Sequence, residues 1–337
     1  QIERLGELID RFFDVQPGAE MGVEVDPREF TREHAEALAA AGFNRASLGI
    51  QDNNRAVQEA IHRVQPHHLN EQTIGILREL GFGSLNVDLI YGLPRQTESG
   101  FRQTLDDVLG LEPDRFAIYS YAHVPWVSPS QKLLEREQLP GPDEKLALLK
   151  LTIETISAAG YDYIGMDHFA RPDDSLAVAR GDGTLRPNFH GYSTGKGVDI
   201  LGFGISSISQ SRTAYFQNEK EIEEYQDDVR ASRVPVVRGV VLSEEDQVRR
   251  AAIMDVMCKT GVDFDDFEQR HGVEFGSYFE AEIGALDVLE QDGLVEREQR
   301  SLRITPLGRL FIRNIAMTFD GYLGDRESRE KRYSTTV

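Results

Sequence analysis

The feature that most restricts the fold of this chain is one pattern of alternation that recurs in four short segments. In 21–26, 46–51, 85–89 and 116–123, apolar residues alternate with polar or small ones. Side chains point to opposite faces of a strand with period two, so each segment predicts a strand with one buried face. The other faces carry, toward the carboxyl ends, Glu24, Gln51, Asp88 and one of the pair Ala122 and His123. A barrel builds its site in this way, with apolar faces toward the helices and polar groups inward.

Helical patterns separate these segments. Residues 31–41, 69–80 and 99–111 each predict a helix, and each follows one of the predicted strands. The succession of strand and helix predicts βα units with a parallel sheet, and therefore an α/β fold. A further helix over 145–159 and a short strand over 161–166 extend this pattern.

The remainder of the chain predicts a smaller, mostly helical C-terminal domain. Residues 170–215 are rich in Gly, Asp and Ser, and we expect them to cover the barrel mouth, with an irregular surface connection as the alternative. From about residue 243, three helical patterns, a hairpin and a last helix resemble a winged helix. The segment is acidic, which favours a packing or lid role over DNA binding. The predicted division is a partial barrel with its covering segment over 1–215, a helical domain over 216–323 and a tail over 324–337.

The formal net charge of −20 at pH 7 argues against two classes of partner. Nucleic acids and anionic membranes are bound through clustered Lys and Arg, so we expect neither. No apolar run reaches the roughly 18–20 residues that span a bilayer. Residues 1–15 predict an amphipathic helix and show no secretory signal. Cys258 is the only cysteine, which excludes an internal disulfide, and we expect a cytoplasmic protein.

Several polar residues on the predicted strands could carry chemistry. Glu24 and Asp26 lie on one face, where two like charges could form an acid–base pair or simply anchor a ligand or a loop. Gln51 and Asp88 favour a ligand-binding site, because buried polar groups are costly unless they are paired or used. Arg63, expected on a short helix after the second strand, could face an anionic ligand group or lie on the surface. These patterns assign no catalytic residue.

Histidines after the predicted strands raise the alternative of a metal site. His123, His168 and His190 follow strands, and Asp167 is adjacent to one of them. The histidine spacings of 45 and 22 residues lack the local pairs that metal motifs use, so we expect no metal ligated by this chain. A metal-dependent barrel hydrolase that uses His123, His168 and Asp167 stays an alternative. The chain contains no Walker A motif and no dinucleotide-binding fingerprint.

Six blocks of sequence carry a resemblance to a known family. They are EVDPR (24–28), GFNRASLGIQD (42–52), NVDLIYGLPRQT (86–97), YAHVP (121–125), GMDHFARPDD (165–174) and NFHGYSTGKGVDILGFGISSIS (188–209). The chain resembles the oxygen-independent coproporphyrinogen III oxidases of the radical S-adenosylmethionine superfamily, from near residue 18 to about residue 323. The resemblance implies a partial radical-SAM barrel of the TIM type.

The resemblance also implies a reaction and its cofactors. Members of the family decarboxylate two propionate side chains of coproporphyrinogen III to vinyl groups in haem biosynthesis. They use a [4Fe–4S] cluster to cleave S-adenosylmethionine reductively, and the resulting radical abstracts a hydrogen atom from the propionate. An electron donor such as flavodoxin, and a monomeric complete enzyme, are further expectations. The cofactor carries the difficult chemistry, while the protein orients it and excludes water.

Six positions of this chain match residues that contact S-adenosylmethionine in the family, which is described with two such molecules. The resemblance implies that Glu24 and Ile208 contact the cluster-bound molecule. It implies that the second molecule is contacted by Gln51, Arg63, Asp88 and Ala122. Three of the six are the inward polar residues that alternation alone identifies. A carboxylate suits a ribose diol or an ammonium group, and an arginine suits a carboxylate.

The chain departs from the family where the cluster is bound. The family's CxxxCxxC cysteines and a glycine-rich segment belong upstream of residue 1, and one cysteine cannot hold a [4Fe–4S] cluster. We therefore expect a fragment of the enzyme that is inactive alone. The alternative is a cluster-free relative that binds a tetrapyrrole or a nucleoside without catalysis. Asn53 also stands where the family has an aromatic residue, which predicts looser packing near Gln51.

Overall fold

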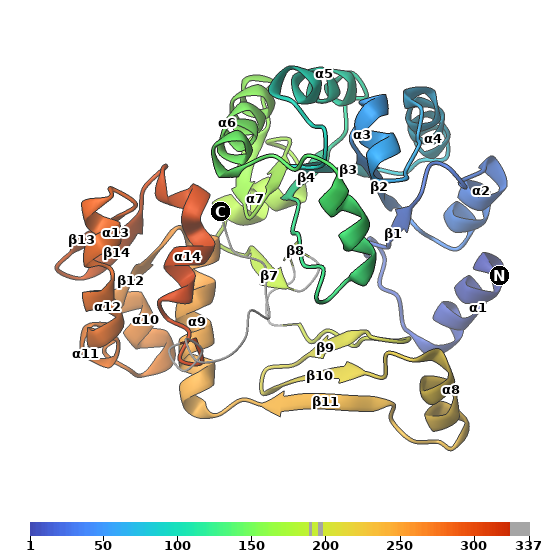
Figure 1. The fold of residues 1–337 in the computed structure, drawn as a ribbon. Helices are drawn as coiled ribbons and strands as arrows, with labels where there is room; N and C mark the ends of the chain where they lie inside the picture. The colour runs from blue at the N-terminus through green and yellow to red at the C-terminus, as the bar shows by residue number, and fades with distance from the viewer. Residues whose placement is uncertain (189–190, 195–197, 324–337) are drawn as a thin grey trace. The chain divides into compact units, whose positions relative to one another are not determined.

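The computed structural model describes residues 1–188, 191–194 and 198–323 (Figure 1). Two compact units divide the chain, one formed by Gln1–Ala177 and a second that begins at Val178. Each unit has its own sheet and its own helices. The predicted division at residue 215 stays a prediction; the first unit ends within α7 (Ser175–Gly181).

A six-stranded sheet forms the centre of the first unit. Its order is β1 (Gly22–Val25), β2 (Arg45–Gln51), β3 (Ser84–Tyr91), β4 (Arg115–Ser120), β6 (His168–Ala170) and β5 (Asp162–Gly165). The first four strands are parallel and follow the chain order, as the sequence predicts. The last two strands pair antiparallel. The parallel order brings the carboxyl ends of β1 to β4 to a single edge of the sheet.

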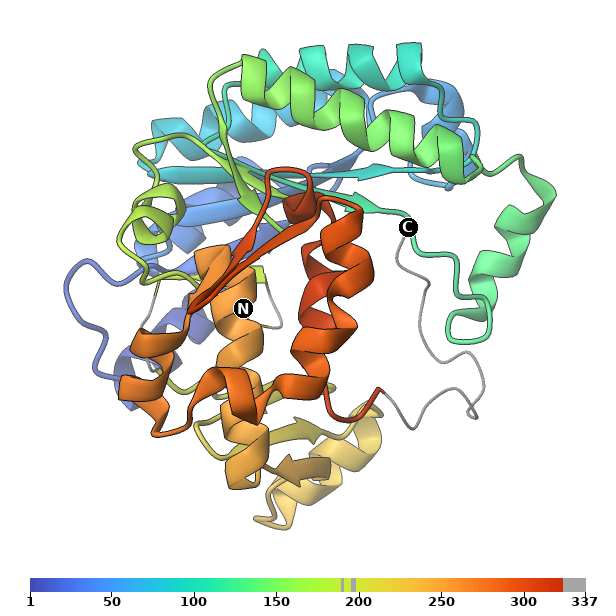
Figure 2. The same ribbon diagram turned by 90° about the vertical axis from the view of Figure 1, so that its left-hand side faces the viewer.

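Figure 2 shows helices along one face of this sheet, and the helices of the first unit include the predicted segments. They are α1 (Ile2–Phe12), α2 (Arg32–Ala40), α3 (Arg55–Ala60), α4 (His67–Glu79), α5 (Glu98–Leu109), the 3₁₀ helix η1 (Pro129–Arg136) and α6 (Pro142–Ala158). Thr31 and Thr97 begin α2 and α5 by accepting hydrogen bonds from backbone N–H groups of the first turn. The α/β class is therefore confirmed.

One face of the parallel strands makes the core of the first unit. Leu48, Ile50, Leu85, Val87 and Leu89 are fully buried, and they pack with helix residues in one continuous cluster. Burial of each such side chain contributes about 1.5–3 kcal/mol, so this face fixes which way every strand is turned. The alternate residues consequently point to the opposite face, where the polar groups lie.

The second unit combines small sheets with helices. Its first part contains β7 (Arg186–Asn188), β8 (Gly191–Ser193), β9 (Ile208–Gln210), β10 (Ala214–Asn218), α8 (Ile222–Arg230) and β11 (Val236–Val241). Its second part contains α9 (Glu244–Lys259), β12 (Gly261–Asp263), α10 (Phe264–His271), α11 (Phe275–Tyr278), α12 (Glu280–Ala285), α13 (Asp287–Gln291), β13 (Val295–Glu298), β14 (Ser301–Ile304), η2 (Gly308–Phe311) and α14 (Ile312–Met317). The expected helices and hairpin after residue 243 are present, with α11, α12 and α13 as three separate short helices. In the core of this part, the rings of Phe267, Phe275, Phe279 and Phe319 pack in edge-to-face and tilted pairs.

Among the described residues, no helix is both long enough and apolar enough to cross a bilayer.

A buried ion pair ties the segment after β6 to the sheet. The Arg115 Nε atom donates to the Asp174 carboxylate at 2.8 Å, and both side chains are almost completely buried. A second guanidinium nitrogen of Arg115 donates to the Ser175 hydroxyl at 2.9 Å. Asp174, the last residue of the GMDHFARPDD block, therefore has a structural role at the amino end of β4.

Removal of Asp174 from the buried ion pair with Arg115 should destabilise the fold. We expect Asp174→Ala to lower the free energy of unfolding by about 3–5 kcal/mol, because it removes the buried carboxylate partner of Arg115 and leaves only the half-exposed Glu20 at 3.5 Å. The exposed neighbour Asp173 provides a matched control, and Asp173→Ala should change stability by less than about 0.5 kcal/mol. Urea unfolding followed by circular dichroism measures both. Equal losses for the two variants would contradict the structural role.

Candidate functional site

Asp88 lies at the centre of the polar face of the parallel sheet. Its Oδ2 atom accepts a hydrogen bond of 3.0 Å from the Ser47 hydroxyl on β2, and its Oδ1 atom accepts one of 2.7 Å from Asn86. Asn86 also donates to the Ser47 oxygen at 2.9 Å. The strand register explains this cluster, because Ser47 pairs with Asn86, and Gly49 with Asp88.

Burial and a nearby charge shift the protonation of Asp88. Burial and, to a smaller extent, the negative charge of Glu24 raise the pKa of Asp88 to about 6, although the hydrogen bonds from Ser47 and Asn86 act in the opposite direction. Glu24 lies on β1 in register with Ser47 and is exposed. Two of the predicted carboxylates thus lie close enough to interact across three adjacent strands.

Gln51 ends β2 in an unusual backbone conformation. Its φ of 68° lies in the left-handed region, which costs a non-glycine residue about 1–2 kcal/mol, and the register of β2 against β3 shifts at this point. The side chain of Gln51 folds back over Gly49. A Cβ atom placed on Gly49 would lie 2.7 Å from the Gln51 Nε2 atom and 3.3 Å from an Arg63 nitrogen. The absence of a side chain at Gly49 therefore leaves room for the Gln51 amide and the Arg63 guanidinium side by side.

Arg63 reaches the same edge from a turn beyond α3. The expectation that it lies on the short helix is wrong, because α3 ends at Ala60. Its guanidinium donates to the Gly49 carbonyl oxygen at 2.8 Å and to the Asp26 carboxylate at 3.2 Å. Its Nε atom is buried and makes no hydrogen bond within the described part of the chain. An unsatisfied buried donor of this kind suits an anionic ligand group.

Asp26 supports Arg63 and does not form the acid–base pair considered from the sequence. Hydrogen bonds from Arg28 lower the pKa of Asp26 to about 2, and the positive charge of Arg63 acts in the same direction. The carboxylate is therefore ionised over the whole physiological range. Of the two interpretations from the sequence, this arrangement corresponds to the anchoring role.

The remaining two predicted residues are placed differently. Ala122 is exposed and follows the carboxyl end of β4, and its carbonyl oxygen accepts a hydrogen bond from Gln131 at 3.2 Å. It therefore lies at the same edge of the sheet as Gln51 and Asp88. Ile208 begins β9 in the second unit, and the structure assigns it no place beside the residues of the first unit.

The residues considered for a metal do not form a site in the described ranges. No group of three His, Cys, Asp or Glu side chains within 1–188, 191–194 and 198–323 lies where it could hold a metal ion. His168 instead bonds the Met166 carbonyl oxygen at 2.7 Å, and His190 lies outside the described residues. Cys258 is buried in α9, where burial raises the pKa of its thiol to about 12. The free thiol is therefore protonated at neutral pH.

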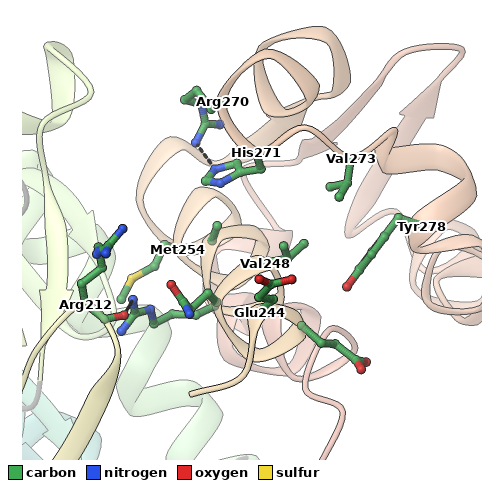
Figure 3. Close-up of a pocket in the computed structure, with 12 residues that line it drawn as sticks. Arg212, Glu244, Val248, Met254, Arg270, His271, Val273 and Tyr278 are labelled. Atoms are coloured by element: carbon green, nitrogen blue, oxygen red, sulfur yellow. Dashed lines mark hydrogen bonds between the residues drawn. The ribbon is translucent and has the colours of Figure 1, made fainter. Parts of the chain in front are cut away.

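A separate pocket lies within the second unit (Figure 3). Its volume is about 750 Å³, and α9 and α10 provide much of its lining. Two of the three arginines that line it have protein partners: Arg270 pairs with Asp255 and donates to His271, and Arg250 donates to backbone carbonyl oxygens. None of the predicted site residues lines this pocket, and no ligand is assigned to it.

Ser47, Gly49 and Asn86 also lie on the polar face, and the alternation by itself indicates no role for them. Ser47 and Asn86 hold the Asp88 carboxylate, and Gly49 leaves the space that two predicted residues share. A glycine within a strand often marks a close approach of this kind, and that signal is present in the sequence.

The opposite pKa shifts of Asp88 and Asp26 predict opposite pH dependence. The pKa of Asp88 is raised from 3.8 to about 6 in the folded state, so its contribution to stability is full below pH 3.8 and is lost as the pH rises through 6. We expect this loss to amount to about 2–3 kcal/mol in the wild type and to disappear in Asp88→Asn. Urea unfolding between pH 4 and 7.5 measures it.

Asp26→Asn is the matched control, because Asp26 has a lowered pKa. Its carboxylate stabilises the fold above pH 3.8 and loses that effect as the pH falls through 2. Asp26→Asn should therefore be less stable than the wild type at pH 7, whereas Asp88→Asn should be more stable. A pH profile of Asp88→Asn parallel to that of the wild type would contradict the assignment.

Comparison with known proteins places the chain in a family. The model of the radical SAM superfamily matches residues 2–108, and the HemN C-terminal domain matches residues 242–311. The chain is 41% identical over its whole length to the oxygen-independent coproporphyrinogen III oxidases of Synechocystis sp. and Escherichia coli, and spans 73% and 74% of their lengths.

A solved structure agrees with the sequence matches. The structure of coproporphyrinogen III oxidase from Escherichia coli, described as a radical SAM enzyme, matches 95% of this chain and 74% of its own with a TM-score of 0.91 and 41% identity. The radical-SAM fold expected from the sequence is thereby confirmed. Together, these matches show that the chain belongs to the oxygen-independent coproporphyrinogen III oxidases of the radical SAM superfamily.

Proposed function

We propose that this protein acts in haem biosynthesis, in the oxygen-independent oxidative decarboxylation of coproporphyrinogen III to protoporphyrinogen IX by radical S-adenosylmethionine chemistry. The observation that carries the proposal is identity of 41% along the entire chain to enzymes named for this activity. The cluster of polar side chains at the carboxyl edge of β1 to β3 supports it, because a barrel binds its ligands at that edge.

The residues at this edge fit S-adenosylmethionine. Arg63 has an unsatisfied buried donor for a carboxylate, and Asp88 offers acceptor oxygens for ribose hydroxyls or an ammonium group. The Gln51 amide lies beside Arg63 over Gly49. When bound, S-adenosylmethionine supplies the hydrogen-abstracting chemistry of the superfamily, while these side chains bind and orient it.

Two molecules of S-adenosylmethionine are part of the proposal. Glu24 and Ile208 would contact one of them. The other would be contacted by four residues of the first unit, Gln51, Arg63, Asp88 and Ala122. The close spacing of Gln51 and Arg63 supports a shared ligand for these two residues.

The residues of this chain do not fit a [4Fe–4S] cluster. The superfamily implies such a cluster, which needs three or four thiolates, but the chain contains one cysteine. That cysteine, Cys258, is buried in the second unit and has a raised thiol pKa. No step of the reaction is therefore assigned through a cluster on these residues.

We also propose that the enzyme receives electrons from a donor such as flavodoxin. We expect the complete enzyme to be monomeric and to act in the cytoplasm. The acidic composition supports the absence of nucleic-acid and anionic-membrane partners, because both bind through clustered basic residues.

A cluster-free relative that binds a tetrapyrrole or a nucleoside without catalysis is the second candidate. One observation supports it: the polar edge of the first unit keeps its arrangement through hydrogen bonds among its own residues. The two candidates differ in whether S-adenosylmethionine is cleaved.

The test uses protein expressed from the complete reading frame that encodes this chain, purified without oxygen. We expect a brown protein that, with dithionite and coproporphyrinogen III, converts S-adenosylmethionine to 5′-deoxyadenosine and forms protoporphyrinogen IX. Chromatography with mass detection measures both products. Binding of the adenosyl compound without cleavage would support the second candidate and contradict the first.

A substitution at Gly49 tests the binding edge separately. Gly49→Ala should weaken binding of S-adenosylmethionine about tenfold, equivalent to about 1.4 kcal/mol, because the new methyl group occupies the place of the Gln51 amide. Gly75→Ala is the control, since a Cβ atom there meets nothing within 4 Å. Calorimetric titration measures the affinities. Equal affinities for the two variants would contradict the placement of the ligand at this edge.

A further inference from the structure

We propose that Asp52 is a positioning residue that fixes the loops after β2 and β3 relative to one another, and thereby the spacing of Gln51 and Asp88. The inference rests on the proposed function, in which those two residues bind the same adenosyl compound. Asp52 itself is fully buried and directly follows Gln51, so it has no access to a ligand.

The Asp52 carboxylate accepts hydrogen bonds from three different parts of the first unit. Its Oδ1 atom accepts from the backbone N–H of Asn54 at 2.6 Å and from the Thr104 hydroxyl of α5 at 2.7 Å. Its Oδ2 atom accepts from the Gln96 amide at 2.6 Å. One side chain therefore joins the loop after β2, the loop after β3 and α5. Hydrogen bonds to a charged acceptor are stronger than those to a neutral one.

Gln96 extends this link to the backbone at the end of β3. Its Oε1 atom accepts from the backbone N–H of Gly92 at 2.6 Å and more distantly from that of Leu93 at 3.3 Å. Its Nε2 atom donates to the Ile90 carbonyl oxygen at 3.0 Å as well as to Asp52. The orientation of the Gln96 amide is therefore fixed: rotation by 180° would leave both N–H groups and both acceptors unsatisfied.

This fixed orientation requires an acceptor at position 52. An asparagine there would keep one oxygen for Asn54 and Thr104 but would turn its NH₂ group toward the NH₂ group of Gln96. Two donors facing each other in a buried site cannot both be satisfied. A carboxylate meets all three donors, which explains an acid in a fully buried position.

The backbone of Asp52 also holds the strained residue before it. The Asp52 N–H donates to the Ile50 carbonyl oxygen at 2.9 Å across Gln51, and the Asp52 carbonyl oxygen accepts from Gln58 at 2.9 Å. The left-handed conformation of Gln51 persists only if its surroundings enforce it. Asp52 provides that enforcement from inside the core, whereas Asp88 is held from the strand side by Ser47 and Asn86.

Asn53 adds to the same arrangement. Its backbone N–H donates to the Thr104 hydroxyl at 3.2 Å, its side-chain amide nitrogen bonds His67 at 2.9 Å, and its oxygen accepts from Asn70 at 3.3 Å. The position at which the sequence predicts looser packing is therefore occupied by a hydrogen-bonded amide. These contacts give the segment after Gln51 a second attachment, to α4.

The experiment compares Asp52→Asn with Asp114→Asn in the full chain. Asp114 is the matched control because its carboxylate also accepts a backbone N–H, that of Leu85 at 2.8 Å, but at the amino end of β3. We expect Asp52→Asn to weaken binding of S-adenosylmethionine about tenfold in calorimetric titration and Asp114→Asn to leave it unchanged. Equal affinities for Asp52→Asn and the wild type would overturn the inference.

Hydrogen exchange without ligand provides a second measurement that does not depend on the proposed function. Asp52→Asn should accelerate amide exchange at Asn54, Gly92 and Leu93, whereas Asp114→Asn should not. Unchanged exchange at Gly92 and Leu93 would overturn the link between the loops. If the wild type binds no adenosyl compound while exchange responds as expected, the proposed function fails and the link between the loops stands.

A milder variant guards against loss of folding. Thr104→Val removes one donor to Asp52 and the acceptor of the Asn53 N–H, and it retains the shape of the side chain. It should produce a smaller change in the same direction at Asn54 in exchange, with the thermal transition retained. Faster exchange spread evenly over the whole chain would indicate general destabilisation and would contradict a positioning role.

Discussion

The structure depends on the way in which parallel strands divide their side chains between two faces. Leu48, Leu85 and Val87 must face the helices, because their burial is the largest favourable contribution available to the first unit. That requirement turns Ser47, Gly49 and Asp88 to the opposite face without any further choice. The parallel order then brings the carboxyl ends of the strands that carry these residues to one edge of the sheet. The polar site is thus a geometric consequence of how the core is packed.

The polar face contains carboxylates whose surroundings differ sharply. Asp26 is held ionised by Arg28 and Arg63, whereas Asp88 is buried near Glu24 and has a raised pKa. The first therefore behaves as a permanent counter-charge for Arg63. The second has a pKa of about 6 and so can change its protonation state near that pH. Asp52, further inside, accepts three hydrogen bonds and stabilises the loops that carry the other groups.

Membership of the oxygen-independent coproporphyrinogen III oxidases agrees with this arrangement. The chain spans about three quarters of the length of the relatives from Synechocystis sp. and Escherichia coli. Arg63, Gln51 and Asp88 all belong to the polar side of the sheet in the first unit. Cys258 is buried in the second unit.

The sequence by itself determined the parallel sheet and the residues on its polar face. Period-two alternation with a constant phase is a local property, and the core enforces it, so Glu24, Gln51 and Asp88 could be placed from pattern alone. Resemblance to a family added Ile208, which no local pattern distinguishes from an ordinary core residue. It also favoured Ala122 over His123, and a ligand contact over a surface position for Arg63.

Only the tertiary structure decided which of these groups touch and how they are charged. The place of Arg63 beyond α3, the space over Gly49 and the link from Asp52 to Gln96 join segments up to 44 residues apart. The pKa of Asp88 depends in the same way on burial and on Glu24, 64 residues away. Such contacts depend on side-chain packing between strands and loops. Local propensity carries no information about that packing, so these features could not be read from the chain alone.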